Sequence, residues 1–164
     1  MIITISGKQG AGKTSVGKEL AKKLDYKFLS IGDLRGEVAI ERGITIDELN
    51  EIGKREDWVH KEADGKTIEI GKTRDNFIIE GWIAYFFIPH SKKIFLDVEE
   101  SAGAERIFKN QRKDENYCET LDEMKKQLKK RLEETKKQFN RYYGIDFLNK
   151  SQYDLVIDTT NLST

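Results

Sequence analysis

Short apolar runs recur along the chain, and segments with a helical spacing of apolar residues separate them. Five runs are rich in β-branched or aromatic residues, at residues 2–6, 27–30, 76–80, 93–98 and 153–158. This composition is typical of strands that are buried on both faces of a sheet. We expect these segments to pair as one sheet.

The intervening segments have the periodicity of amphipathic helices. We expect a helix over residues 14–24, two or three helices over 33–72, and a helix over 102–112. A longer helix is expected from Leu121, because Met124, Leu128, Leu132 and Phe139 continue one apolar stripe. Strands that alternate with helices predict a parallel sheet with helices on both faces, which is a three-layer α/β fold.

Composition narrows the class of protein. The 164 residues suit a single domain, and 29 basic residues balance 29 acidic residues, which is unlike a general nucleic-acid binder. No apolar run is long enough to span a bilayer, and the N-terminal residues do not resemble a secretory signal. The single Cys118 fits a reducing compartment, so we expect a cytoplasmic protein, and we expect a monomer. His60 and His90 lack metal-ligand spacing, so surface positions are predicted for both.

The strongest chemical signal is a phosphate-binding loop between the first strand and the first helix. Residues 7–14 read GKQGAGKT and fit the pattern G-x-x-x-x-G-K-[ST] in full. Backbone N–H groups of such a loop converge on phosphate oxygens, and the helix N-terminus adds partial positive charge. The residues expected to hold ATP are Gly7, Lys8, Gln9, Gly10, Ala11, Gly12, Lys13, Thr14 and Ser15.

A metal site and a set of arginines would complete a phosphoryl-transfer centre. Thr14 can place its hydroxyl on Mg²⁺, and Glu80, which closes the third strand, is the first candidate for the assisting acid, ahead of Asp97. Three arginines, Arg106, Arg112 and Arg131, flank a polar stretch at residues 113–116 that we interpret as a lid. Surface ion pairs are the alternative interpretation for each arginine. The absence of an Asn-Lys-x-Asp segment argues against a GTPase.

Several further segments occur in the order found in one known family. They are FLSIGDLR at 28–35, IEG at 79–81, AERI at 104–107, YGID at 143–146 and YDLVIDT at 153–159. Together with the loop at residues 7–14, they make the chain resemble the short archaeal-type cytidylate kinases of the nucleoside monophosphate kinase superfamily. The resemblance runs nearly from end to end.

The resemblance implies a P-loop kinase fold and assigns roles along the chain. It implies a five-stranded parallel core at residues 1–30, 76–105 and 141–164, a helical acceptor-binding insert at about 31–75, and a lid with flanking helices at about 106–140. It implies ATP and Mg²⁺ as cofactors and CMP or dCMP as the small-molecule acceptor. Lys13, Arg106, Arg112 and Arg131 would be catalytic, with Arg106 over the adenine. The acceptor would be bordered by Ser30, Gly32, Asp33, Arg35, Gly81 and Trp82.

The chain departs from the family pattern on the acceptor side alone. Gly36 and Trp82 stand where the pattern has arginines, and Thr135 and Gln138 stand where it has an aspartate and an arginine. Trp82 could stack on a base or belong to the core. Each lost arginine–phosphate contact removes roughly 1.5–3 kcal/mol. Two alternatives therefore remain open: a P-loop kinase with a different small-molecule acceptor, and an ATP-binding interaction module without catalysis.

Overall fold

The computed structural model describes residues 1–53, 55–56, 58–111 and 117–162. Its centre is a five-stranded sheet with the strand order β2-β3-β1-β4-β5, in which all pairs are parallel. The strands are β1 (Ile2–Gly7), β2 (Lys27–Ser30), β3 (Phe77–Glu80), β4 (Lys92–Asp97) and β5 (Leu155–Asp158). The five predicted strands and their parallel arrangement are confirmed.

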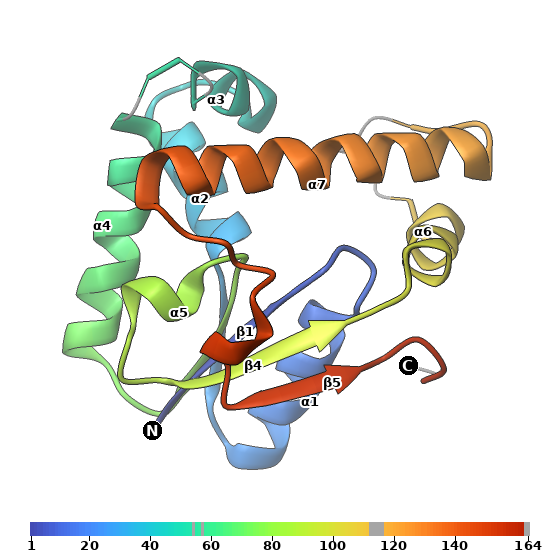
Figure 1. The fold of residues 1–164 in the computed structure, drawn as a ribbon. Helices are drawn as coiled ribbons and strands as arrows, with labels where there is room; N and C mark the ends of the chain where they lie inside the picture. The colour runs from blue at the N-terminus through green and yellow to red at the C-terminus, as the bar shows by residue number, and fades with distance from the viewer. Residues whose placement is uncertain (54, 57, 112–116, 163–164) are drawn as a thin grey trace.

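Helices fill the intervals between the strands (Figure 1). They are α1 (Lys13–Leu24), α2 (Ile31–Glu41), α3 (Ile46–Gly53), α4 (Trp58–Thr73), α5 (Ala84–Phe87), α6 (Glu100–Lys109) and α7 (Leu121–Tyr143), with a 3₁₀ turn η1 (Lys150–Gln152) before β5. The expected helix at 102–112 is α6, which begins earlier and ends at Lys109. The short α5 and η1 were not predicted, because one turn leaves no periodic signal.

The hydrophobic core lies on both faces of the sheet. On one face, Ala21 of α1 packs with Ile3, Ile5, Ile78 and Leu96 of the strands. The other face is covered by α2, α4 and α5, which contribute Leu34, Ile70 and Ala84 to the core, and by Ile88 directly after α5. Their strand partners there include Ile2, Phe77 and Ile79. The three predicted layers are therefore present.

Parallel strands bring their C-terminal ends to one edge of the sheet. The pairing of Ser30 with Glu80, and of Ile5 with Glu80, places the end of β3 between the phosphate-binding loop and the start of α2. Above this edge, α7 crosses from α6 to α3 and α4 (Figure 1). A capping box at Thr120 and Glu123 starts α7, and Gly144 in the left-handed conformation ends it. Ligands of open α/β sheets bind at this edge.

Candidate active site

The loop between β1 and α1 is a tightly curled backbone. Gly7, Gly10 and Gly12 all have positive φ, and α1 begins at Lys13 directly after Gly12. At Gly10 the turn also packs on the α6 backbone, because a Cβ there would lie 2.4 Å from the carbonyl oxygen of Gly103. Only glycine fits that position. The predicted loop geometry is present, while nucleotide binding by residues 7–15 stays a prediction.

Lys13 points back across this loop. Its Nζ donates hydrogen bonds to the carbonyl oxygens of Lys8 at 2.8 Å and Gly7 at 3.1 Å. Burial lowers the pKa of Lys13 to about 8, while the Glu80 carboxylate opposes this shift and the Arg131 guanidinium adds to it. The ammonium is thus held in a confined space beside a carboxylate and a guanidinium, which is the setting needed to meet a phosphate.

Thr14 and Glu80 form the pair expected at a metal site. The Thr14 hydroxyl donates to the two carboxylate oxygens of Glu80, at 2.9 and 3.0 Å, and Glu80 is buried at the end of β3. Mg²⁺ in kinases is bound through one or two protein oxygens, with water and substrate phosphates completing the shell. Within the described ranges no group of three His, Cys, Asp or Glu side chains gathers to hold a metal. One hydroxyl and one carboxylate therefore fit Mg²⁺ and do not form an all-protein cage.

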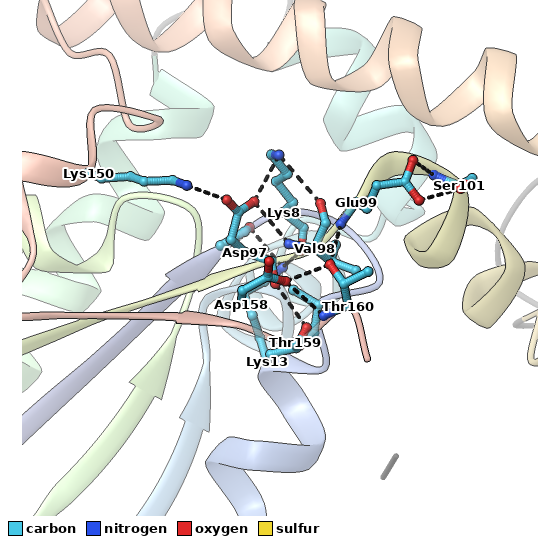
Figure 2. A network of polar contacts seen from close by, with 12 residues as sticks. Lys8, Lys13, Asp97, Val98, Glu99, Ser101, Lys150, Asp158, Thr159 and Thr160 are labelled. Atoms are coloured by element: carbon cyan, nitrogen blue, oxygen red, sulfur yellow. Dashed lines mark hydrogen bonds and ion pairs between the residues drawn. The ribbon is translucent and has the colours of Figure 1, made fainter. Parts of the chain in front are cut away.

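Asp97, the second metal candidate, is engaged elsewhere. Figure 2 shows its carboxylate between Lys8, at 2.8 Å, and Lys150, at 2.5 Å. Burial acts to raise the pKa of Asp97, but hydrogen bonds from these two lysines bring it below its usual range. A carboxylate neutralised by two ammonium groups is a poor metal ligand, so the geometry favours Glu80.

Arg106 braces the phosphate-binding loop against the C-terminal turn. Its guanidinium donates to the carbonyl oxygens of Gly10, Thr159, Thr160 and Leu162, at 2.6 to 3.2 Å. The turn after β5 is thereby fixed beside the loop, on the side where the resemblance places the adenine. Contact between Arg106 and adenine stays a prediction.

Of the other two predicted arginines, the structure describes Arg131 alone. Arg112 lies outside the described residues, as does the stretch 113–116 that we interpreted as a lid. Arg131 projects from α7 toward the loop, where its Nε lies 3.3 Å from the amide of Gln9. That amide also lies 3.2 Å from the carbonyl oxygen of Leu128. Arg131 also lies near enough to Lys13 for the two positive charges to interact.

A cavity of about 300 Å³ lies between the loop and α7. Lys8 and Gln9 line it from the loop, Val98 and Ser101 from the segment after β4, and Leu128 from α7. Three lysines of α7 complete that wall: Lys125, Lys126 and Lys129. The space under α7 is thus hollow next to the loop, and four lysines line it together with Glu99 and Glu100.

The predicted acceptor residues gather across the sheet edge from the loop. Ser30 ends β2, Gly32 and Asp33 lie exposed at the start of α2, and Gly81 and Trp82 follow β3. Because Ser30 pairs with Glu80, both segments start side by side. The half-buried Trp82 has the Lys13 ammonium 5.3 Å from its ring centre and meets Phe147 edge to face at 5.0 Å. Trp82 therefore packs on the core and also contacts Lys13 of the loop.

Arg35 belongs to a polar cluster that sequence reasoning missed. It donates to Asn50 of α3 at 2.9 Å, and it faces Asp64 of α4, whose carboxylate accepts a hydrogen bond from Tyr143 of α7. Burial raises the pKa of Asp64 to about 6, against the Tyr143 hydrogen bond and the Arg35 charge. Burial lowers the pKa of Arg35, and Asp64 and Tyr143 oppose that shift. The Arg35 guanidinium, partly neutralised by Asp64, thus lies on the side where the resemblance places the acceptor.

Comparison with known proteins places the chain in a family. A sequence model described as the cytidylate kinase-like family matches residues 2–161. The chain belongs to that family. It is 33% identical to a cytidylate kinase of Methanosphaera stadtmanae, covering 97% of this chain and 88% of that protein. It is 36% identical to a cytidylate kinase of Saccharolobus islandicus strain L.S.2.15, covering 99% and 84%.

Two further similarities differ in kind. An S-adenosylmethionine-dependent nucleotide dehydratase of Lacinutrix mariniflava is 32% identical over 98% of this chain, but the chain spans only 33% of that protein. Among solved structures, a shikimate kinase of Bacteroides thetaiotaomicron aligns with a TM-score of 0.67 at 21% identity, covering 100% of this chain and 89% of that one. At that identity the structural likeness shows the kinase fold alone.

The structure shows what surrounds two of the residues that depart from the family pattern, Gly36 and Gln138. Gly36 faces open space, because a Cβ there would meet no atom within 4 Å. Gln138 lies against α4, with its amide nitrogen 2.9 Å from Nε2 of His60.

The surface position predicted for His60 is wrong: its side chain is buried between Gly53 and the ring of Tyr142. His90 is exposed as predicted. No described element is long and apolar enough for a membrane-spanning helix.

Proposed function

We propose that this kinase transfers the γ-phosphoryl group of ATP to the phosphate of CMP or dCMP. The observation that carries the proposal is the Thr14–Glu80 hydrogen bond beside Lys13 at the head of the loop, with Arg35 across the sheet edge. Donor-side groups and an acceptor-side arginine thus share one edge. The family membership and the names of the archaeal relatives support the same acceptor.

Each residue has a role that follows from its position. Loop N–H groups of residues 7–14 bind donor phosphates, and Lys13 and Arg131 stabilise charge that develops on the transferred phosphoryl. Thr14 and Glu80 would hold Mg²⁺, which supplies charge neutralisation at the phosphate oxygens. The acceptor phosphate oxygen attacks phosphorus, the bond to the β-phosphate oxygen breaks, and ADP leaves. The protein forms no covalent bond, and its contribution is to align the two nucleotides and exclude water.

A second candidate acceptor is favoured by the surroundings of Trp82. The Trp82 ring stands where the family pattern has an arginine, and it contacts the ring of Phe147 and the ammonium group of Lys13. A neutral or differently shaped small molecule would fit such a wall better than a second phosphate. If this candidate is correct, Trp82→Arg, alone or with Gly36→Arg, should raise turnover of CMP, and the open space at Gly36 leaves room for the new side chain.

The test is an assay of ADP release with Mg²⁺ and ATP against CMP, dCMP, UMP, AMP and GMP, beside a control without acceptor. Strong release with CMP or dCMP is expected. Release equal to the control with every nucleotide would overturn the proposal. If calorimetry still detected tight ATP binding in that case, a binding module without phosphoryl transfer would be the better description.

A cytoplasmic location, a monomeric state and the absence of a nucleic-acid partner are part of the same proposal. They rest on the balanced charge and the single cysteine. Size-exclusion chromatography with light scattering tests the monomer. A dimer at assay concentrations would contradict it.

A further inference from the structure

The C-terminal end of α7 lies against the insert, which is formed by α2, α3 and α4 (Figure 1). We call this junction the α7–insert contact. The residues that form it are Gln138, Tyr142 and Tyr143 on α7, with Gly53, His60 and Asp64 on the insert.

Polar groups of the two elements meet at short distances in this contact. The Tyr143 hydroxyl donates to Asp64, and the Gln138 amide nitrogen lies 2.9 Å from Nε2 of His60 and 3.5 Å from the carbonyl oxygen of Gly53. The rings of His60 and Tyr142 lie 5.0 Å apart. Two neighbouring helices of the insert, α3 and α4, are therefore held by one helix.

The α7 side of the contact is itself fixed to the core. The Tyr143 ring packs on Phe87 at 5.5 Å, on Phe86 at 5.7 Å and on Phe139 at 6.1 Å. The first two aromatic residues belong to α5, which follows β3. Tyr143 thus connects the sheet to the insert, with an apolar ring in the core and a polar tip on Asp64.

The contact continues to the arginine that faces the acceptor. Asp64, held by Tyr143, faces the guanidinium of Arg35, and Asn50 of α3 accepts a hydrogen bond from the same guanidinium at 2.9 Å. The position of Arg35 therefore depends on α3 and α4, and their position depends on α7.

We propose that Tyr143 and Gln138 are positioning residues for the acceptor, which hold the insert and Arg35 in place through protein contacts alone. The proposal rests on the proposed function, in which Arg35 meets the acceptor phosphate. A protein that orders its binding groups beforehand loses less free energy when the ligand binds. Such ordering offsets the charge missing at Gly36 and Trp82. It also gives Gln138 a role that does not require contact with the acceptor.

The test compares Tyr143→Phe and Gln138→Leu with a control on the outer face of α7. Lys130→Gln is that control, because the Lys130 side chain is exposed and its ion pair with Glu134, at 3.9 Å, lies on the surface. Losing a hydrogen bond to a charged group should raise the KM for CMP about tenfold in Tyr143→Phe, and a smaller rise is expected in Gln138→Leu. The KM for ATP and kcat should stay within about twofold, since the phosphoryl-transfer groups are untouched. Gln138→Glu keeps the shape of the side chain but has no N–H to donate to the Gly53 carbonyl oxygen, so its KM for CMP should rise as in Gln138→Leu.

Hydrogen exchange without any nucleotide gives a readout that does not depend on turnover. Amides of α3 and α4 should exchange faster in Tyr143→Phe and Gln138→Leu than in Lys130→Gln, while those of α1 stay unchanged. If CMP is no substrate of the unaltered protein, the proposed function fails, and exchange alone decides the present proposal. Unchanged exchange in both variants would overturn it, as would equal rises in the KM for ATP and for CMP. Tyr143→Phe keeps the packed ring and should fold. If Tyr143→Phe does not fold, the same measurements on Gln138→Leu decide the proposal.

Discussion

The partly buried carboxylate of Asp64 makes the stability of the fold depend on pH, and the sign follows from its shifted pKa. Burial raises its pKa from 3.8 to about 6, so the folded protein binds this proton more tightly than the unfolded chain. The ionised form is therefore unfavourable in the fold. Stability associated with Asp64 is highest below pH 4, is lost as pH rises from 4 to 6, and stays low above that range. Replacing Asp64 with Asn removes the titrating group and leaves an amide oxygen to accept from Tyr143.

The magnitude follows from the pKa difference. About two pKa units correspond to about 3 kcal/mol, at roughly 1.4 kcal/mol per unit. Asp64 is only partly buried, so solvent screening reduces the full cost to roughly 1–2 kcal/mol. Part of this cost is already present at pH 4.5. The free energy of unfolding of Asp64→Asn, relative to the unaltered protein, should therefore increase by about 1 kcal/mol between pH 4.5 and pH 7.5.

Urea denaturation of both proteins at pH 4.5, 6.0 and 7.5 measures this difference. The Arg35 charge stays constant over the range, so its altered surroundings in the variant add a fixed offset that cancels between pH values. Asp122→Asn, at an exposed position in the first turn of α7, is the matched control and should show no comparable increase. An offset for Asp64→Asn that is equal at all three pH values would refute the reasoning, because it would mean that the carboxylate ionises as easily in the fold as in water.

Three other substitutions test the donor side. Lys13→Ala should lower kcat at least about 100-fold through loss of charge at the phosphoryl group, with the melting temperature unchanged or raised; near-normal turnover would contradict the mechanism. Glu80→Gln should raise the Mg²⁺ concentration needed for half-maximal activity while the KM for CMP stays constant, and an unaltered Mg²⁺ titration would exclude Glu80 from the metal site. Arg106→Ala should lower the melting temperature by several degrees, because several carbonyl oxygens lose their hydrogen-bond donor, and amides near Thr159 should exchange faster. If neither change is seen, the hydrogen bonds of Arg106 do not stabilise the loop and the C-terminal turn.

The fold was predictable because its signals are local. Strands buried on both faces require continuous apolar runs, and the long stripe from Leu121 to Phe139 lies within α7 as expected. The Thr14–Glu80 pair also followed from local rules, since the loop fixes Thr14 and the strand end fixes Glu80. Local sequence patterns therefore predict the loop, Thr14 and Glu80, which form the proposed donor half of the site.

The acceptor half depends on contacts between residues that are distant in sequence. Tyr143 and Asp64 are 79 positions apart, and Gln138 and His60 are 78 apart. No periodicity or motif pairs such residues in a single sequence. The segment 143–146 drew attention as a motif, but nothing indicated that the Tyr143 hydroxyl meets a carboxylate. His60 was misassigned for the same reason, because Tyr142 and Gly53 cover it from other elements.

The close approach of Gly10 to Gly103 affects how tolerant the chain is to substitution. A Cβ at residue 103 would lie 2.7 Å from the carbonyl oxygen of Gln9, so even alanine there would push on the loop from behind. The shape of the phosphate-binding loop therefore depends on a residue of α6 that packs behind it. A library of random variants scored for survival should show Gly103 as intolerant as the loop glycines, and a reader of those scores alone would mistake it for a binding residue.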